Sequence, residues 1–145
     1  MKILKTSFVR EPDPEEYHEK VSRPSIVGKF LINLIGSLDV ENVVAIHVDR
    51  QNNIICVDYV HIGTDSESFF HPKTILRRAL LTGARGIIMA HNHPGGSLIP
   101  SDNDIEATNR LVNACKIIGV EFLDALIVTD TGFYSFAEHN LLDSY

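Results

Sequence analysis

The amino-acid sequence predicts an α/β (α+β) fold in which a mixed β-sheet is flanked by helices. Short apolar segments with strand character alternate along the chain with longer segments of helical periodicity. This order of elements favours helices packed against the faces of a sheet. The chain has 145 residues, of which 44% are hydrophobic, and these values fit one domain with a sizeable core.

The N-terminal residues 1–24 are expected to form a short strand and a linker ahead of the main domain, residues 25–145. The strand is predicted over Ile3–Val9. The segment 10–16 that follows is rich in proline and glutamate, which is typical of a connector.

The next part of the chain is predicted to form a helix and a β-hairpin. Apolar residues at helical spacing from Ile26 onward predict a helix that ends near Gly36. Val43–Val48 and Ile54–Ile62 have the composition of strands, and the turn residues 51–53 between them indicate a hairpin.

The remaining chain is predicted to alternate helices with strands. Gly83 and Gly119 each follow a segment of helical periodicity, and glycine at that position commonly ends a helix. The expected elements are a helix Pro72–Leu81, a buried strand Gly86–His91, a long helix Asp102–Ile118, and short strands Val120–Val128 and Phe133–Phe136.

The segment His91–Asp104 places two histidines, a serine and a carboxylate around a loop of proline and glycine. Residues i and i+2 of a strand point to the same face, so His91 and His93 are expected to project together while Asn92 points away. Asp104 lies on the first turn of the predicted helix and can point back to the imidazoles. Two imidazoles and a carboxylate suit Zn²⁺ and leave its fourth position open, as in catalytic zinc sites.

The same residues also fit a purely structural interpretation. Ser101 followed three residues later by Asp104 is an ordinary helix start, in which the serine caps the helix. A lone His-x-His pair is more often solvated or hydrogen-bonded than bound to a metal. Capping and metal ligation can coexist at neighbouring residues, so both interpretations stay open at this point.

The string H-x-H-x₇-S-x₂-D, from His91 to Asp104, resembles the JAMM (MPN+) metalloprotease motif. The fuller string, with its Asn-His-Pro, Gly and Pro-Ser, resembles the RadC-like branch of that superfamily. Glu41 precedes a predicted strand at the place where the family carries its acidic residue. The resemblance covers roughly residues 20–137 and includes three further pairs, Gly63-Thr64, His71-Pro72 and Leu123-Asp124.

This resemblance implies the cytidine-deaminase-like three-layer architecture of JAMM domains. It also implies a zinc metallohydrolase that cleaves a peptide or isopeptide bond in a protein or peptide substrate. In that activity His91, His93 and Asp104 would hold zinc, Glu41 would be the general base, and Ser101 would donate a hydrogen bond to the oxyanion. The RadC name suggests one alternative, a non-enzymatic interaction module in DNA repair or a mobile-element pathway.

Other residues near the motif are expected to support the site or depart from the family pattern. Asn92 is expected to hold the ligand loop through side-chain-to-backbone bonds, and Asp124 to accept a hydrogen bond from a ligand histidine. Three residues depart from the pattern without removing a proposed ligand: Gly95 stands where serine is common, Lys73 where arginine is usual, and Ala125 where histidine is usual.

Composition argues against several other classes of function. The net charge of −6 does not favour a nucleic-acid surface, which needs a basic patch. A nucleobase deaminase would need a Cys-x-x-Cys pair, whereas Cys56 and Cys115 stand far apart and are expected to be free, buried thiols. No apolar run reaches the ~18 residues that span a bilayer, and Met1–Thr6 lacks a signal-peptide pattern, so a cytoplasmic location is expected.

Overall fold

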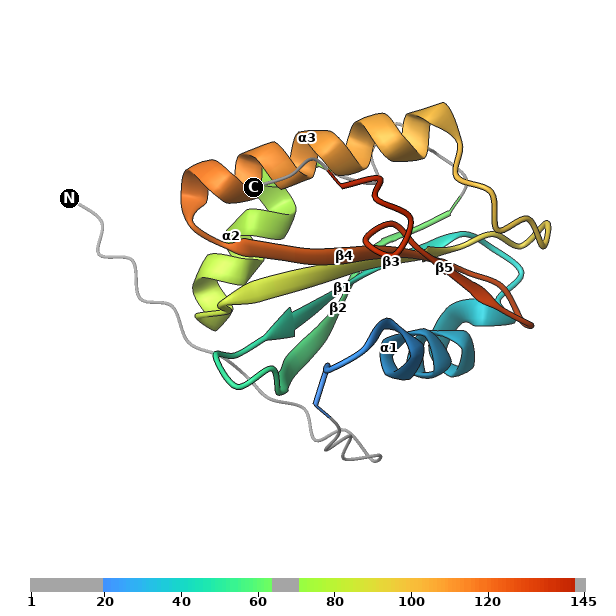
Figure 1. The fold of residues 1–145 in the computed structure, drawn as a ribbon, viewed down its shortest axis with the longest axis horizontal. Coiled ribbons are helices and arrows are strands. Elements are labelled where there is room, and N and C mark those ends of the chain that lie inside the picture. Colours follow the sequence, from blue (N-terminus) through green and yellow to red (C-terminus); the bar gives the residue numbers. More distant parts are fainter. Residues whose placement is uncertain (1–19, 64–70, 143–145) are drawn as a thin grey trace.

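The computed structural model describes residues 20–63 and 71–142, and the predicted strand Ile3–Val9 lies outside these ranges. Within them the chain forms a five-stranded sheet with helices on both faces (Figure 1). The elements are α1 (Pro24–Leu31), a π-helical segment η1 (Ile32–Gly36), β1 (Asn42–Val48), β2 (Ile54–Ile62), α2 (Pro72–Thr82), β3 (Gly86–Asn92), α3 (Asp102–Ile118), β4 (Glu121–Val128) and β5 (Phe133–Ser135).

These elements confirm the predicted fold class, and most of their bounds agree with the sequence patterns. The glycines explain much of this agreement, because Gly83 and Gly119 adopt left-handed backbone angles and end α2 and α3. The helix expected to end near Gly36 is divided, since α1 stops at Leu31 and a π-helical turn continues to Gly36. Gly28 allows α1 to approach the sheet closely, because a Cβ there would collide with the ring of Phe133.

The strands lie in the order β2-β1-β3-β4-β5, and the sheet is mixed. β1 runs antiparallel to both β2 and β3, β3 runs parallel to β4, and β4 runs antiparallel to β5. The antiparallel pair β1 and β3 places the start of one strand beside the end of the other, so that Val43 pairs with His91. Residues just before β1 therefore lie near residues that end β3.

Alternate residues of the central strands face opposite helical layers, which confirms the three-layer arrangement. One face packs under α2 and α3, and the other packs over α1 and η1 (Figure 1). Strand residues on the first face include Val43, Ala45, Ile87, Met89, Ala125 and Ile127. Those on the second face include Val44, Ile46, Ile88, Ala90, Leu126 and Val128.

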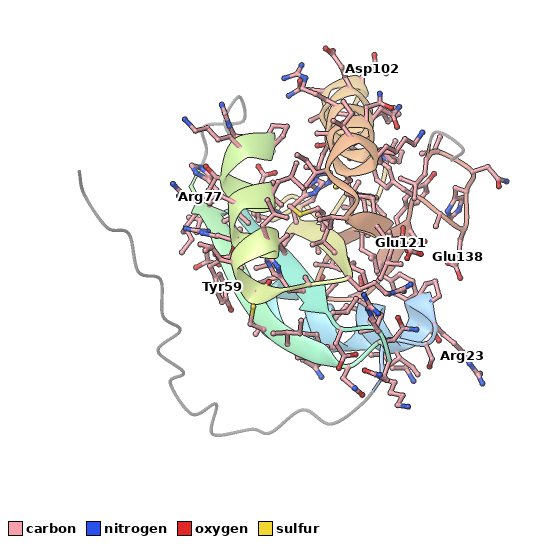
Figure 2. The ribbon with its side chains drawn as sticks, turned by 90° about the vertical axis from the view of Figure 1, so that its left-hand side faces the viewer. Arg23, Tyr59, Arg77, Asp102, Glu121 and Glu138 are labelled. Atoms are coloured by element: carbon pink, nitrogen blue, oxygen red, sulfur yellow. The ribbon has the colours of Figure 1, made fainter. Side chains whose placement is uncertain are left out.

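Polar and apolar residues share the outer surfaces of the helices, where Leu80 of α2 and Ile117 of α3 expose 58% and 86% of their surface. Figure 2 shows Arg77 on α2 and Asp102 at the start of α3 projecting away from the sheet. Cys115 is buried and free, and its burial raises the pKa of the thiol to about 12; Cys56 is free and half-buried. Within the described residues, no helix combines the length and the apolar character needed to cross a bilayer.

Candidate metal centre

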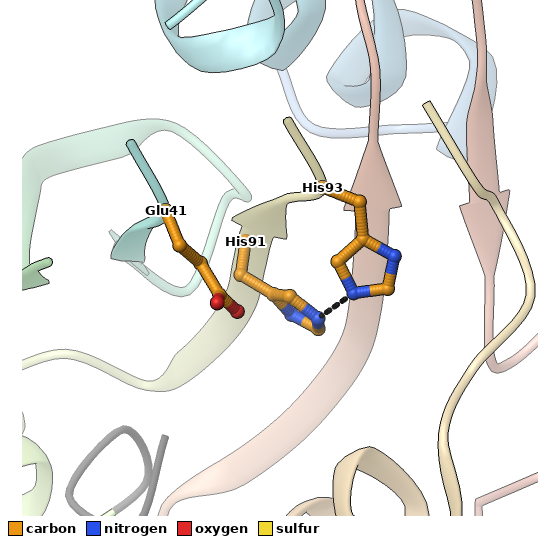
Figure 3. A group of neighbouring side chains, drawn as sticks. All are labelled: Glu41, His91 and His93. Atoms are coloured by element: carbon orange, nitrogen blue, oxygen red, sulfur yellow. Dashed lines mark hydrogen bonds between the residues drawn. The ribbon is translucent and has the colours of Figure 1, made fainter. Parts of the chain in front are cut away.

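The two histidines of the motif meet at the end of β3. His91 belongs to this buried strand, on the same face as Met89, and His93 follows one residue after the strand ends. Their Nε2 atoms lie 3.0 Å apart (Figure 3). Two nitrogen ligands of one tetrahedral Zn²⁺ are about 3.3 Å apart, given Zn–N bonds of about 2.0–2.1 Å. The pair therefore has a spacing that fits a shared metal ion.

A backbone carbonyl fixes the orientation of the His93 ring. The Nδ1 atom of His93 lies 2.7 Å from the carbonyl oxygen of Ser97. A carbonyl oxygen only accepts hydrogen bonds, so Nδ1 carries the proton and the Nε2 lone pair is left to face the site. The turn that brings Ser97 back is closed by the amide of Gly96, which donates to the His93 carbonyl at 3.0 Å and has φ of 83°. A hydrogen bond from the ring nitrogen that does not face the metal, like the one between His93 Nδ1 and the Ser97 carbonyl, is typical of metal-binding histidines.

Asp104 both caps α3 and contacts the two imidazoles. The Ser101 hydroxyl oxygen accepts from the Asp104 amide at 3.0 Å, and Asp104 Oδ2 accepts from the Ser101 amide at 2.9 Å. The carboxylate also lies 3.3 Å from His91 Nε2 through Oδ1 and 3.6 Å from His93 Nε2 through Oδ2. Capping and convergence on the histidines thus occur in the same residue.

The electrostatic environment of Asp104 favours the ionised carboxylate. Burial alone would raise its pKa, but hydrogen bonds with His91 and His93 outweigh burial and hold the pKa well below its usual range. The pKa of His93 is raised, chiefly by its hydrogen bond with Asp104. In the absence of a metal, these two shifts favour a protonated His93 paired with the Asp104 carboxylate.

Glu41 enters the site from the other side. It precedes β1, and the antiparallel pairing of β1 with β3 brings it beside His91 (Figure 3). One ligand atom each from Glu41, His91 and His93 lie within 4.8 Å of one another, so this triplet too could hold a metal ion. The Glu41 carbonyl accepts a hydrogen bond from the Gly63 amide at 2.9 Å. Burial raises the pKa of the Glu41 carboxyl group, which makes it easier to protonate than Asp104.

The other sequence-predicted residues have different surroundings from those expected. Asn92 does bond to backbone, but to the segment Leu38–Asn42 rather than to its own ligand loop. The Asp124 carboxylate accepts from the Ser135 hydroxyl and from two backbone amides, so its bonds fasten the end of β5 and not a ligand histidine. Ala125 packs in the core under α3.

The sequence did not predict the partners in two contacts of the site, although the family resemblance includes Gly63. The Gly63 amide that holds Glu41 comes from the end of β2, 22 residues further along the chain. The carbonyl oxygens that Asn92 binds belong to Leu38 and Val40, more than 50 residues upstream. Only the pairing of β1 with both of its neighbours brings these groups together.

The arrangement offers two imidazole nitrogens and two carboxylates around one point. Nitrogen and oxygen ligands of this kind bind borderline divalent ions such as zinc, and the residues present fit such an ion. Three of the four groups suffice to hold it, which leaves one carboxylate to act on a molecule bound at the metal.

The chain is similar to known proteins over most of its length. The model of the RadC-like JAB domain matches residues 21–141. A UPF0758 protein of Finegoldia magna is 43% identical over 106 residues, covering 73% of this chain and 48% of that protein. UPF0758 proteins of Moorella thermoacetica and Symbiobacterium thermophilum are 38% and 40% identical, over 84% and 82% of this chain and 53% and 51% of their own lengths.

The chain thus spans about half the length of these curated relatives. The matched region contains the five-stranded sheet and each residue of the candidate site, from Glu41 to Asp104. The extent of the match and the three-layer fold lead to one conclusion. The chain belongs to the RadC-like JAB domain family.

Proposed function

We propose that this domain is a zinc-dependent metallohydrolase that cleaves a peptide or isopeptide bond in a protein or peptide substrate. The observation that carries the proposal is the convergence of Glu41 on the cluster of His91, His93 and Asp104. His91, His93 and Asp104 are the proposed zinc ligands. Zinc bound there would lower the pKa of a water molecule that it holds toward 7 and polarise a carbonyl oxygen.

The residues of the chain then carry the proton through the reaction. Glu41 accepts a proton as the water oxygen bonds to the carbonyl carbon, and it delivers that proton to the amine as the carbon–nitrogen bond breaks. Its raised pKa supports this role, because a carboxylate that is easier to protonate is a better base. The Ser101 hydroxyl oxygen accepts a hydrogen bond from the Asp104 amide. The hydroxyl proton of Ser101 is therefore left to donate to the developing oxyanion.

The metal part of the proposal is tested by mutation of both histidines. His91→Ala combined with His93→Ala should remove stoichiometric zinc while the circular dichroism spectrum stays that of the wild type. His71→Ala is a matched control, because His71 is exposed and its side chain makes no capping bond to α2. Unchanged zinc content in the double variant would contradict the assignment of these ligands.

The catalytic part is tested with Glu41→Gln, which keeps the size of the side chain and removes the base. Zinc-loaded wild type is first screened against peptides and ubiquitin-like conjugates to find a cleaved substrate. Glu41→Gln should retain zinc and lose turnover by about 10²–10⁴-fold, and Glu138→Gln, at an exposed position, should change neither. Wild-type turnover by Glu41→Gln would overturn the mechanism, and failure of the zinc-loaded protein to cleave any amide would favour the interaction-module alternative.

A further inference from the structure

Asn92 is the residue between the two histidines, and its side chain faces the opposite side of the sheet from His91. It is fully buried and follows Ala90 on the face that packs over α1. Its Oδ1 atom accepts a hydrogen bond from the Asn42 amide at 2.6 Å. Its Nδ2 atom donates to the carbonyl oxygens of Leu38 at 3.2 Å and Val40 at 3.1 Å. One side chain thus binds the backbone on both sides of Glu41.

Packing does little to hold the segment that Asn92 binds. Residues 37–40 are exposed, and Leu38 and Val40 expose 37% and 44% of their surface. Apolar burial therefore contributes little to the position of this segment, and its order depends on hydrogen bonds to its backbone. Asn92 makes three of these bonds, and the side chain of Asn42 adds one to the Val40 carbonyl at 2.9 Å.

The bonds of Asn92 help to fix the distance between Glu41 and the proposed ligands His91 and His93. Asn92 sits in β3 directly beside His91, and its amide is fixed to the segment that carries Glu41. A shift of β3 would therefore move the histidines and the Glu41 segment together. General-base catalysis needs such fixed spacing, since a displacement of about 1 Å can cost about 10²-fold in rate.

We propose that Asn92 is a positioning residue that fixes Glu41 beside the proposed metal ligands by binding the backbone of Leu38–Asn42. The inference rests on the proposed function for its catalytic consequence. The hydrogen-bonded link itself is independent of metal and substrate, so the two can be tested separately.

The first test follows the link in metal-free protein. Asn92→Leu keeps the branched shape of the side chain and removes all three bonds, while Asn92→Asp keeps the acceptor for the Asn42 amide and loses both donors. Amide hydrogen exchange over residues 38–42 should rise by at least about tenfold in both variants, since Asn92→Leu removes the bonds and Asn92→Asp places a buried carboxylate against the carbonyl oxygens of Leu38 and Val40. Exchange in β4 should not change. A crystal structure of either variant should show the Glu41 carboxylate displaced from His91.

The matched control is Ser135→Ala. Ser135 is fully buried, and its hydroxyl donates to Asp124 at the end of β5, so this variant also loses a buried hydrogen bond. It should lower global stability without raising exchange over 38–42. If both Asn92 variants showed wild-type exchange over residues 38–42 and an unmoved Glu41 carboxylate, the positioning role would be overturned, whatever the catalytic outcome.

The second test uses turnover per bound zinc. Both Asn92 variants should retain zinc affinity within about threefold and keep KM, while kcat falls by about 10²-fold because Glu41 is misplaced. Combined with Glu41→Gln, Asn92→Leu should cause little further loss, since both changes remove the same base. Ser135→Ala should keep wild-type kcat.

Multiplicative losses in the double variant, or wild-type kcat in the single variants, would show that Asn92 does not act through Glu41. If the wild type cleaves no substrate, the proposed hydrolase function fails. The exchange and structural measurements then still decide whether Asn92 positions Glu41.

Discussion

Asp104 and Glu41 lie on either side of the histidine pair, and the chain holds them in different ways. The Asp104 side chain is fixed directly, because its oxygens contact both imidazoles and the Ser101 amide. Glu41 is fixed through its backbone, by the Gly63 amide and by the bonds that Asn92 makes to neighbouring residues. Asp104 is therefore held at its carboxylate group, whereas Glu41 is held through its backbone.

Their pKa values diverge accordingly. Hydrogen bonds lower the pKa of Asp104, while burial raises the pKa of Glu41. When the environment shifts the pKa values of two neighbouring acids in opposite directions, the chemical roles of the two acids commonly differ as well. This difference supports the proposed roles, in which Asp104 binds the metal as a permanent anion and Glu41 transfers a proton and so changes its charge.

The largest expected effect compares zinc affinity in Asp104→Asn and Glu41→Gln. Asp104→Asn should weaken zinc binding by about 100-fold or more, because it removes a charged ligand while an amide oxygen can still accept from Ser101. Glu41→Gln should bind zinc within about threefold of the wild type. Competition with a chromophoric chelator measures both. The opposite ranking would make Glu41, His91 and His93 the ligand set and would reverse the assignment.

The next effect is a pH window in the stability of the metal-free protein. The pKa of Asp104 is lowered, so its contribution is present above about pH 4 and is lost as the pH falls through the lowered value. The pKa of His93 is raised, so its contribution is present below about pH 6.5 and is lost as the pH rises through the raised value. The pair should therefore stabilise the fold most between these limits.

Urea denaturation of wild type and Asp104→Asn, in the presence of a chelator, measures this window. The wild type should be more stable by about 2 kcal/mol near pH 5, as expected for hydrogen bonds between charged groups. The difference should shrink at both lower and higher pH. A difference that stays constant across the range would mean that the two groups do not interact as an ion pair.

The smallest effect separates the capping role of the helix start from its role at the site. Ser101→Ala removes the acceptor for the Asp104 amide and should cost about 1 kcal/mol, or about 3 °C in Tm for a chain of this size. Ser101→Asn should restore this loss, because asparagine also caps helices well. If both variants were equally unstable, the hydroxyl itself would contribute more than a cap, and thermal denaturation decides between these outcomes.

Local signals predicted the parts of the site that are close in sequence. The two-residue period of β3 predicted that His91 and His93 share a face. The helix start at Ser101 predicted that Asp104 lies on the first turn of α3 and points toward the imidazoles. Glycine at 83 and 119 ended the helices as expected. Each of these depends on backbone rules that act over a few residues.

Parts of the site that depend on strand order could not be predicted in the same way. Glu41 could have reached the histidines through antiparallel pairing or through a returning loop, and the structure has the antiparallel pair of β1 and β3. The backbone partners of Asn92 and the Ser135 partner of Asp124 lie on other strands or loops, so these bonds follow from the sheet and not from nearby residues. The π-helical turn before Gly36 also had no signal in the apolar spacing.

The pairing of Val43 with His91 has a consequence for folding fidelity. A slip of one residue in β3 would exchange its two faces, turning the imidazole of His91 toward α1 and the amide of Asn92 toward α3. Such a misfolded chain would keep nearly the same content of helix and strand and would still be compact. It would nevertheless have lost the proposed ligand pair, so that zinc uptake would discriminate correctly aligned molecules from misaligned ones that spectroscopy of the backbone cannot tell apart.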